Sequence, residues 1–199
     1  MHARHILVPL SVLAGAAAVV LWRGFGGAPI VDLSGDVSAC AANLRHIYTD
    51  MVLYGTRHHT EQRLPQESGV RLLAALAASE DDGYLTCPGP GAEPVPKNVD
   101  YGDRESLTGA ASAYAARDTH AFPLAKFPSG GAEIEPLVAC DNAHGLNHEG
   151  CMNVLYSDGS VVTLFLSQEI ERGRLPAGST TIPVGQDSPI PDLRKLSPD

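Results

Sequence analysis

Four side chains in the second half of the chain have the types and spacing of metal ligands. Asp141, His144 and His148 follow one another closely, and Asp158 comes shortly after them. Imidazole and carboxylate groups suit Zn²⁺, or Ca²⁺ where oxygen ligands dominate. Two histidines four residues apart face one metal only on a helix, and the glycine and asparagine between these two favour a loop. The alternative is structural: His148 bonds the backbone of a hairpin, and Asp158 forms its turn.

The cysteines are a second group with chemistry of their own. There are four, namely Cys40, Cys87, Cys140 and Cys151, and none belongs to a Cys-x-x-Cys motif, which argues against a zinc ribbon or a thioredoxin-like site. An even number suits an oxidising compartment. We therefore predict two disulfides, Cys40–Cys87 and Cys140–Cys151. The alternative is a reduced protein with four buried thiols.

Enzymatic signatures are missing from the sequence. It contains no Gly-x-Ser-x-Gly nucleophile motif, no phosphate-binding P-loop and no dinucleotide-binding Gly-x-Gly-x-x-Gly after a strand. With 14 Lys and Arg against 23 Asp and Glu, the net charge is −9, which disfavours nucleic acid as a partner. We predict a protein that is not an enzyme and has no cofactor, apart from the Zn²⁺ or Ca²⁺ considered above.

The amino terminus predicts a membrane partner. The run from Ile6 to Trp22 is 17 residues long, carries no charge and lies between Arg4 and Arg23. This length is at the lower limit for spanning a bilayer. Residues 1–23 are therefore expected to form a membrane anchor, with a cleaved signal peptide as the alternative, although no small-x-small cleavage site follows. Residues 24–36 form a Gly-rich spacer.

Residues 37–175 have the patterns of a folded α+β domain. Leu44, Ile47, Tyr48 and Met51 recur at helical spacing and predict a long helix over 37–57. A second helix is expected over 69–79 because that stretch is rich in strong helix formers. A proline-rich loop follows, over 87–98.

The second half of this domain is predicted to be β. Strands are expected over 111–117 and 135–140, followed by a hairpin over 152–166. The dipeptide Asp158-Gly159 predicts a type I′ turn at the centre of this hairpin. One helical turn is expected over 168–172. Residues 176–199 contain five prolines and few apolar residues, which predicts a flexible tail.

Four fragments resemble one bacterial family when they are taken in order. His148 is separated by nine residues from Asp158-Gly159, as in the prepilin-type processing-associated H-X9-DG family, whose members resemble type II secretion pseudopilins. The other three fragments begin upstream. They are Cys40-Ala-Ala-Asn43-Leu44-Arg45-His46-Ile47, the stretch from Tyr54 to Pro65, and Leu85-Thr86-Cys87-Pro88.

This resemblance implies a pilin-like domain, in which one long helix packs on an antiparallel sheet and an amino-terminal helix lies in the membrane. It also implies a non-enzymatic protein on the periplasmic side of the inner membrane. Its role would be in type II secretion or cell-surface assembly, through contact with other envelope or secretion-assembly proteins. The alternative function is a metal-binding, hydrolase-like extracytoplasmic domain that uses His144, His148 and Asp158.

The chain departs from this family at the prepilin peptidase site. Gly24-Phe25 follows the apolar run instead of preceding it, and Pro29 stands where such members have glutamate. The chain is therefore expected to be a divergent, simply anchored relative.

Overall fold

The computed structural model describes residues 35–58, 63–76, 85–96, 99–128, 134–140 and 145–199. The predicted anchor or signal at 1–23 and most of the spacer lie outside these residues, as do Asp141 and His144. No helix within the described ranges combines the length and the apolar character that a membrane span requires.

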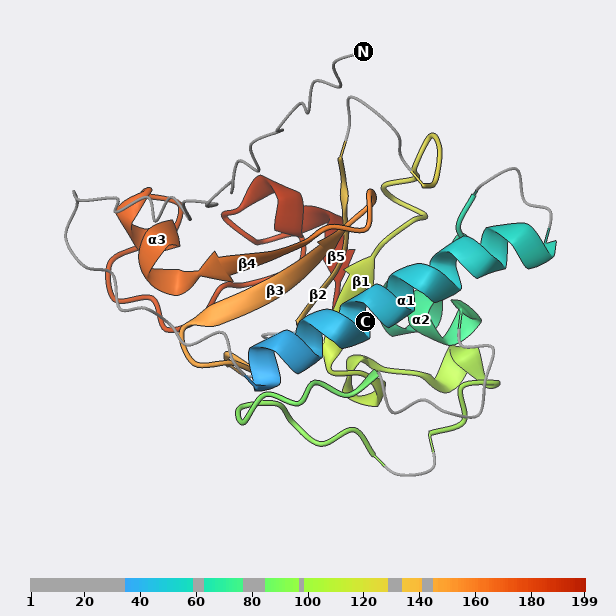
Figure 1. Cartoon of the computed structure of the whole chain (residues 1–199), viewed down its shortest axis with the longest axis horizontal. Helices are drawn as coiled ribbons and strands as arrows, with labels where there is room; N and C mark the ends of the chain where they lie inside the picture. The colour runs from blue at the N-terminus through green and yellow to red at the C-terminus, as the bar shows by residue number, and fades with distance from the viewer. Residues whose placement is uncertain (1–34, 59–62, 77–84, 97–98, 129–133, 141–144) are drawn as a thin grey trace, which may run out of the picture. The chain divides into compact units, whose positions relative to one another are not determined.

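The longest element is the helix α1, Asp36–His58 (Figure 1). Its buried residues recur every three or four positions and so form one face. They are Val37, Cys40, Leu44, Ile47 and Met51. This face packs against strands β3 and β4 and against helix α2. The long helix predicted over 37–57 is confirmed.

Helix α2 spans Gly69–Leu76 and is almost entirely apolar. Most of its apolar side chains are buried, and the helix contacts α1 and strand β1 (Tyr114–Arg117). The helix therefore begins where the sequence predicts, and the predicted continuation to residue 79 lies outside the described residues.

Five antiparallel strands form the sheet, in the order β4-β3-β2-β1-β5. In chain order they are β1 (Tyr114–Arg117), β2 (Pro136–Cys140), β3 (Cys151–Tyr156), β4 (Val161–Phe165) and β5 (Leu196–Ser197). Every residue of β2 is buried, so both faces of the sheet are covered at its centre. The fold is α+β with an antiparallel sheet, as predicted, and α3 (Leu166–Glu171) provides the predicted helical turn after the hairpin.

The β3–β4 hairpin forms as predicted, but its turn differs from the expected type I′. The Tyr156 amide donates to the Ser160 carbonyl (2.8 Å), and the Gly159 amide donates to the Tyr156 carbonyl (2.9 Å). The connection is therefore a three-residue loop from Ser157 to Gly159, with Gly159 at a φ of +83°. This is the pattern of a type I turn followed by one left-handed residue, which also places glycine at the left-handed position.

The segment 176–199 is part of the fold, which corrects the prediction of a flexible tail. Four of its apolar side chains are buried, namely Ile182, Ile190, Leu193 and Leu196. Strand β5 pairs with β1, and the short helix Pro191–Lys195 contacts β2 and β5. The prediction failed because these apolar residues are spaced irregularly among prolines, so no helical or strand period reveals them.

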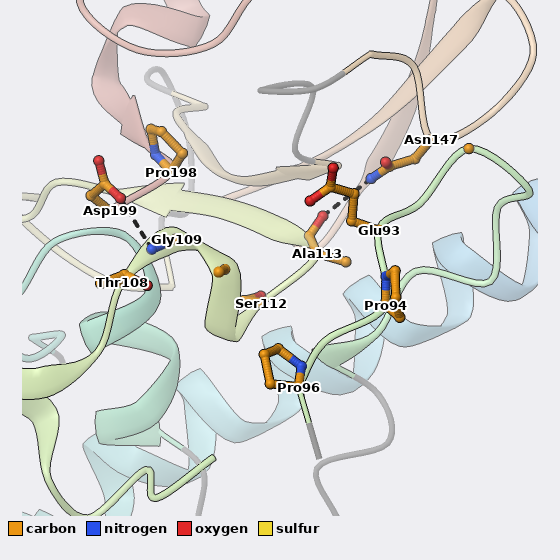
Figure 2. A pocket seen from close by; sticks show the side chains of 12 residues that line it. Glu93, Pro94, Pro96, Thr108, Gly109, Ser112, Ala113, Asn147, Pro198 and Asp199 are labelled. Atoms are coloured by element: carbon orange, nitrogen blue, oxygen red, sulfur yellow. Dashed lines mark hydrogen bonds between the residues drawn. The ribbon is translucent and has the colours of Figure 1, made fainter. Parts of the chain in front are cut away.

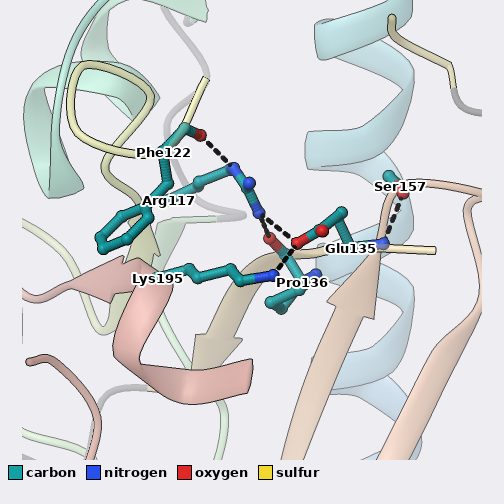
Figure 3. Close-up of polar contacts among 6 residues, drawn as sticks. All are labelled: Arg117, Phe122, Glu135, Pro136, Ser157 and Lys195. Carbon is teal, nitrogen blue, oxygen red and sulfur yellow. Dashed lines mark hydrogen bonds and ion pairs between the residues drawn. The ribbon is translucent and has the colours of Figure 1, made fainter. Parts of the chain in front are cut away.

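An ion-pair group fastens this C-terminal segment to the sheet (Figure 3). The Glu135 carboxylate lies 3.2 Å from the Arg117 guanidinium and 2.5 Å from the Lys195 ammonium. The Arg117 side chain is 3% exposed and also donates to the carbonyls of Phe122 and Pro136. Burial acts to raise the pKa of Glu135, but the two cations outweigh it and lower that pKa.

Candidate metal centre

Three thiols and one imidazole meet in the core between α1 and the sheet. One ligand atom each from Cys40, Cys87, Cys140 and His148 lies within 4.8 Å of all the others. We call this group the thiol–imidazole cluster. Its residues are at most 8% exposed. They come from four segments: α1, the loop before β1, the end of β2 and the loop before β3.

Helix α1 supplies the first ligand and positions the second. Cys40 lies on its buried face, and Asn43 follows one turn later. The Asn43 side-chain amide donates to the Thr86 carbonyl at 3.0 Å, and the Tyr114 hydroxyl donates to the same carbonyl at 3.2 Å. The residue that follows Thr86 is Cys87. These two hydrogen bonds therefore hold Cys87 beside the helix.

Two glycines after Cys87 let its loop lie directly on the His148 segment. A Cβ atom on Gly89 would lie 2.0 Å from the Asn147 carbonyl oxygen and 2.8 Å from Nδ1 of His148. A Cβ on Gly91 would lie 2.1 Å from the Leu146 carbonyl oxygen. The Gly91 amide donates to the Asn147 carbonyl at 3.1 Å. No side chain larger than hydrogen fits at these two contacts.

The sheet provides the other fixed points of the cluster. Cys140 is the last residue of β2 and pairs with Tyr114 of β1. The Asn147 side-chain amide donates to the Ala113 carbonyl at 3.2 Å, which ties the His148 loop to the residue before β1. Cys151, the first residue of β3, is buried as well but does not belong to the cluster.

Inside the cluster, the groups form a chain of close polar contacts. Sγ of Cys40 lies 2.9 Å from Sγ of Cys140, and Sγ of Cys87 lies 3.2 Å from Nε2 of His148. Nδ1 of His148 lies 2.9 Å from the Asp36 carboxylate, at the beginning of α1. The imidazole therefore joins a buried thiol on one side to a carboxylate on the other.

These contacts shift the pKa of four groups, namely Asp36, Cys40, Cys140 and His148. Hydrogen bonds with Cys140 and Cys87 lower the pKa of the Cys40 thiol. Hydrogen bonds with Cys40 and Cys87, together with burial, raise the pKa of the Cys140 thiol. Burial acts to lower the pKa of His148, but hydrogen bonds with Cys40, Cys87 and Asp36 outweigh it and raise that pKa to about 11. The Asp36 pKa is lowered, chiefly by its hydrogen bond to His148. Within the cluster, the contacts thus favour the thiolate form at Cys40 and the thiol form at Cys140.

The four cysteines are free thiols in the structure, in place of the predicted disulfides Cys40–Cys87 and Cys140–Cys151. Three of them share one cluster, so any single bond between two of these leaves the third without a partner there. The predicted partner of Cys140, Cys151, lies outside the cluster, and Cys140 contacts Cys40 instead.

Of the four metal ligands proposed from sequence, the structure describes two, His148 and Asp158, and these two lie apart. His148 precedes β3 and Asp158 follows it, so the strand separates them. The Asp158 carboxylate instead accepts hydrogen bonds from the Ser160 amide (2.9 Å) and hydroxyl (2.6 Å), which lower its pKa. Asp158 therefore stabilises the hairpin loop, as the structural alternative predicted. Asp141 and His144 lie outside the described residues.

A pocket of about 540 Å³ lies between the loop that follows Cys87, the residues before β1 and the C-terminus, and none of the four cluster residues lines it (Figure 2). Its walls include Glu93, Asn147 and Asp199, together with several prolines and glycines. Asp199 accepts a hydrogen bond from the Gly109 amide, and Asn147 donates to the Ala113 carbonyl. Because these two polar side chains bind the protein's own backbone, the pocket does not present them as a catalytic pair.

Sequence reasoning named each member of the cluster but missed their convergence. The available clues were the resemblance fragments themselves. Each of three fragments contributes one cluster residue, Cys40, Cys87 and His148 in turn. Cys140, the fourth, lies in none of them.

Comparisons with protein-family models, with curated proteins and with solved structures found no match to this chain. The resemblance to the H-X9-DG family therefore rests on the four motif fragments alone.

Proposed function

We propose that this protein is a membrane-anchored, pseudopilin-like protein of the periplasmic side of the inner membrane. In this proposal it has no enzymatic activity and takes part in type II secretion or cell-surface assembly through contacts with other envelope proteins. The observation that carries the proposal is the packing of the 23-residue helix α1 against an antiparallel sheet, which is the arrangement implied by the family resemblance.

The positions of the motif residues also support this proposal. The Cys40-to-Ile47 fragment contributes three of the side chains that α1 buries, and Asn43 connects it to the Leu85-to-Pro88 fragment. Gly159 of the Asp-Gly pair lies against the ring of Tyr48 on α1. The motifs thus lie where the helix joins the rest of the domain, as expected for elements that maintain a shared fold.

The alternative of a hydrolase-like domain gains no support from the geometry. That function requires His148 and Asp158 in one site, but β3 lies between them. The imidazole of His148 is 1% exposed, so a substrate would have no access to it.

Photo-crosslinking in the native host tests the proposal. A photoreactive residue is introduced at Leu53 of α1 or at Val162 of β4, two apolar positions that are 38% and 44% exposed. Glu171, an exposed charged residue on α3, serves as the control position. We expect the protein in the membrane fraction and a discrete light-dependent adduct with an envelope protein from Leu53 or Val162, but not from Glu171. Recovery in the cytosolic fraction without any such adduct would contradict the proposal.

A further inference from the structure

We propose that Cys40, Cys87, Cys140 and His148 bind one Zn²⁺ ion in a closed structural site. Three thiolates and one imidazole are a ligand set that structural zinc sites use. Sulfur and nitrogen donors in a compact tetrahedral group favour zinc over the hard cations Ca²⁺ and Mg²⁺. This inference is independent of the role in envelope assembly, because it concerns what holds the domain together.

The donor spacing is close to that of a tetrahedral zinc site. With Zn–S bonds of about 2.3 Å and a Zn–N bond of about 2.0 Å, tetrahedral geometry places two sulfurs about 3.8 Å apart and a sulfur and the nitrogen about 3.5 Å apart. Here the contact from Cys40 to Cys140 is 2.9 Å and that from Cys87 to His148 is 3.2 Å, while no pair exceeds 4.8 Å. Both contacts are shorter than the tetrahedral distances, so these side chains would move apart to admit the ion.

Asp36 prepares the imidazole for metal binding. Nδ1 of His148 lies 2.9 Å from the Asp36 carboxylate, and Nε2 points to the thiols. Binding of Zn²⁺ at Nε2 would displace the proton from that nitrogen, and the ring would then be a neutral imidazole that donates from Nδ1 to Asp36. This carboxylate–histidine pairing is the usual outer contact of histidines that bind zinc, and it fixes both the tautomer and the ring orientation.

The burial of the cluster indicates a structural role for the metal. Catalytic zinc keeps a position open for water or substrate, whereas structural zinc has four protein ligands. Here four protein ligands are present, and Cys40, Cys140 and His148 are at most 1% exposed. Since the ligands come from α1, from β2 and from two loops, one ion would fasten the long helix to the sheet.

The first measurement is the metal content and cobalt spectrum of the purified full chain. We expect about one zinc per chain, and replacement by Co²⁺ should give the intense visible bands of a tetrahedral site with thiolate charge transfer. Removal of zinc by a chelator should lower the melting temperature by about 10 °C or more, because the free energy of metal binding contributes to folding.

A matched pair of variants then tests the ligands. Cys140→Ala and Cys151→Ala each remove a buried thiol from the end of a strand, but only Cys140 belongs to the cluster. We expect Cys140→Ala to lose both the zinc and the thiolate-to-cobalt absorption, and Cys151→Ala to keep both. Asp36→Asn retains a hydrogen-bonding group and should weaken zinc affinity about 10- to 100-fold in competition with a chromophoric chelator.

Several results would overturn the proposal. The first is wild-type protein, purified in the presence of zinc, that contains no metal and has a disulfide between two of the cluster cysteines. The second is an octahedral cobalt spectrum without thiolate bands. The third is equal zinc loss in Cys140→Ala and Cys151→Ala. The first two use the wild-type chain, so they decide the question even if a variant fails to fold.

Discussion

At the scale of single residues, Gly89 makes a very close contact beside the thiol–imidazole cluster. A Cβ atom there would lie 2.0 Å from the Asn147 carbonyl oxygen, which is backbone and cannot rotate away. Gly89→Ala must therefore push the Cys87 loop away from the His148 segment. We expect a loss of about 1–3 kcal/mol in the free energy of unfolding, the usual effect of overpacking, together with loss of bound zinc.

Urea unfolding and zinc content measure these two effects. Gly102→Ala is the matched control, because the nearest atom to its added Cβ belongs to the flexible Asp100 side chain, at 3.0 Å. If Gly89→Ala is as stable as Gly102→Ala and keeps its zinc, the close packing of the two loops is not required.

The cluster also shows what residue types and spacing cannot predict. The sequence pointed to His148 and to all four cysteines, but it predicted two disulfides where the structure has four free thiols. Cys40 and Cys140 are 100 residues apart, and Cys87 and His148 are 61 apart. Contacts at such separations depend on how α1 crosses the sheet. Local periodicity relates residues within one or two helical turns of each other, so it cannot predict contacts between residues this far apart.

At the scale of elements, the β3–β4 hairpin depends on Gly159 for two reasons. Its φ is +83°, a conformation that side chains with a Cβ rarely adopt, and an added Cβ would lie 3.0 Å from the Tyr48 ring of α1. Gly173 has a φ of +69° but open space around it. We expect both Gly→Ala variants to lose about 1 kcal/mol to backbone strain, and Gly159→Ala to lose about 1 kcal/mol more.

Thermal and urea unfolding of the two variants separate strain from packing. Equal losses would mean that the Tyr48 ring moves aside without cost. No loss at Gly159 would contradict the left-handed conformation of the loop.

The Glu135 ion pairs join three elements, and their contribution depends on pH. The folded-state pKa of Glu135 lies below its ordinary value of 4.5. Its stabilising effect is therefore complete above that value and is lost as pH falls through the lower, folded-state pKa. At about pH 7, Glu135→Gln should lower the free energy of unfolding by about 1.5–3 kcal/mol, because it leaves the buried Arg117 without its carboxylate.

Urea unfolding of wild type and Glu135→Gln over a range of pH values checks this dependence. We expect the difference between the two proteins to shrink steadily as the pH falls from about 5 to about 3. Because other titrating groups are common to both proteins, their effects cancel in the difference. A difference that is constant or that grows toward acid pH would show that the ion pairs do not stabilise the charged carboxylate.

Elements with a strong local pattern were predictable, and those that depend on distant contacts were not. The spacing of Leu44, Ile47 and Met51 predicted α1, and two apolar runs around Asp158-Gly159 predicted the hairpin. Strand β5 has two residues, Leu196 and Ser197, and exists only because β1 has a free edge to pair with. No local pattern of that length can specify a strand.

At the scale of the whole molecule, the C-terminal segment completes the core. Residues Leu33–Asp199 form one compact unit, and the core includes side chains from α1, from the sheet and from the segment after residue 175. Sparse aromatic content, at 6% of the chain, leaves the core to smaller apolar residues. Each buried leucine or isoleucine of the C-terminal segment therefore forms a substantial part of the apolar core.

Leu193 tests whether this segment belongs to the cooperative fold. Its side chain is fully buried, so Leu193→Ala should lower the free energy of unfolding by about 2–5 kcal/mol, through lost burial and the cavity left behind. Leu53→Ala makes the same chemical change at a site that is 38% exposed and should change stability by about 0.5 kcal/mol or less. Urea unfolding followed by circular dichroism measures both in the full chain. Equal stability of the two variants would mean that the segment separates from the sheet before the domain unfolds, whereas a large loss confined to Leu193→Ala would show that the core extends to the C-terminal strand.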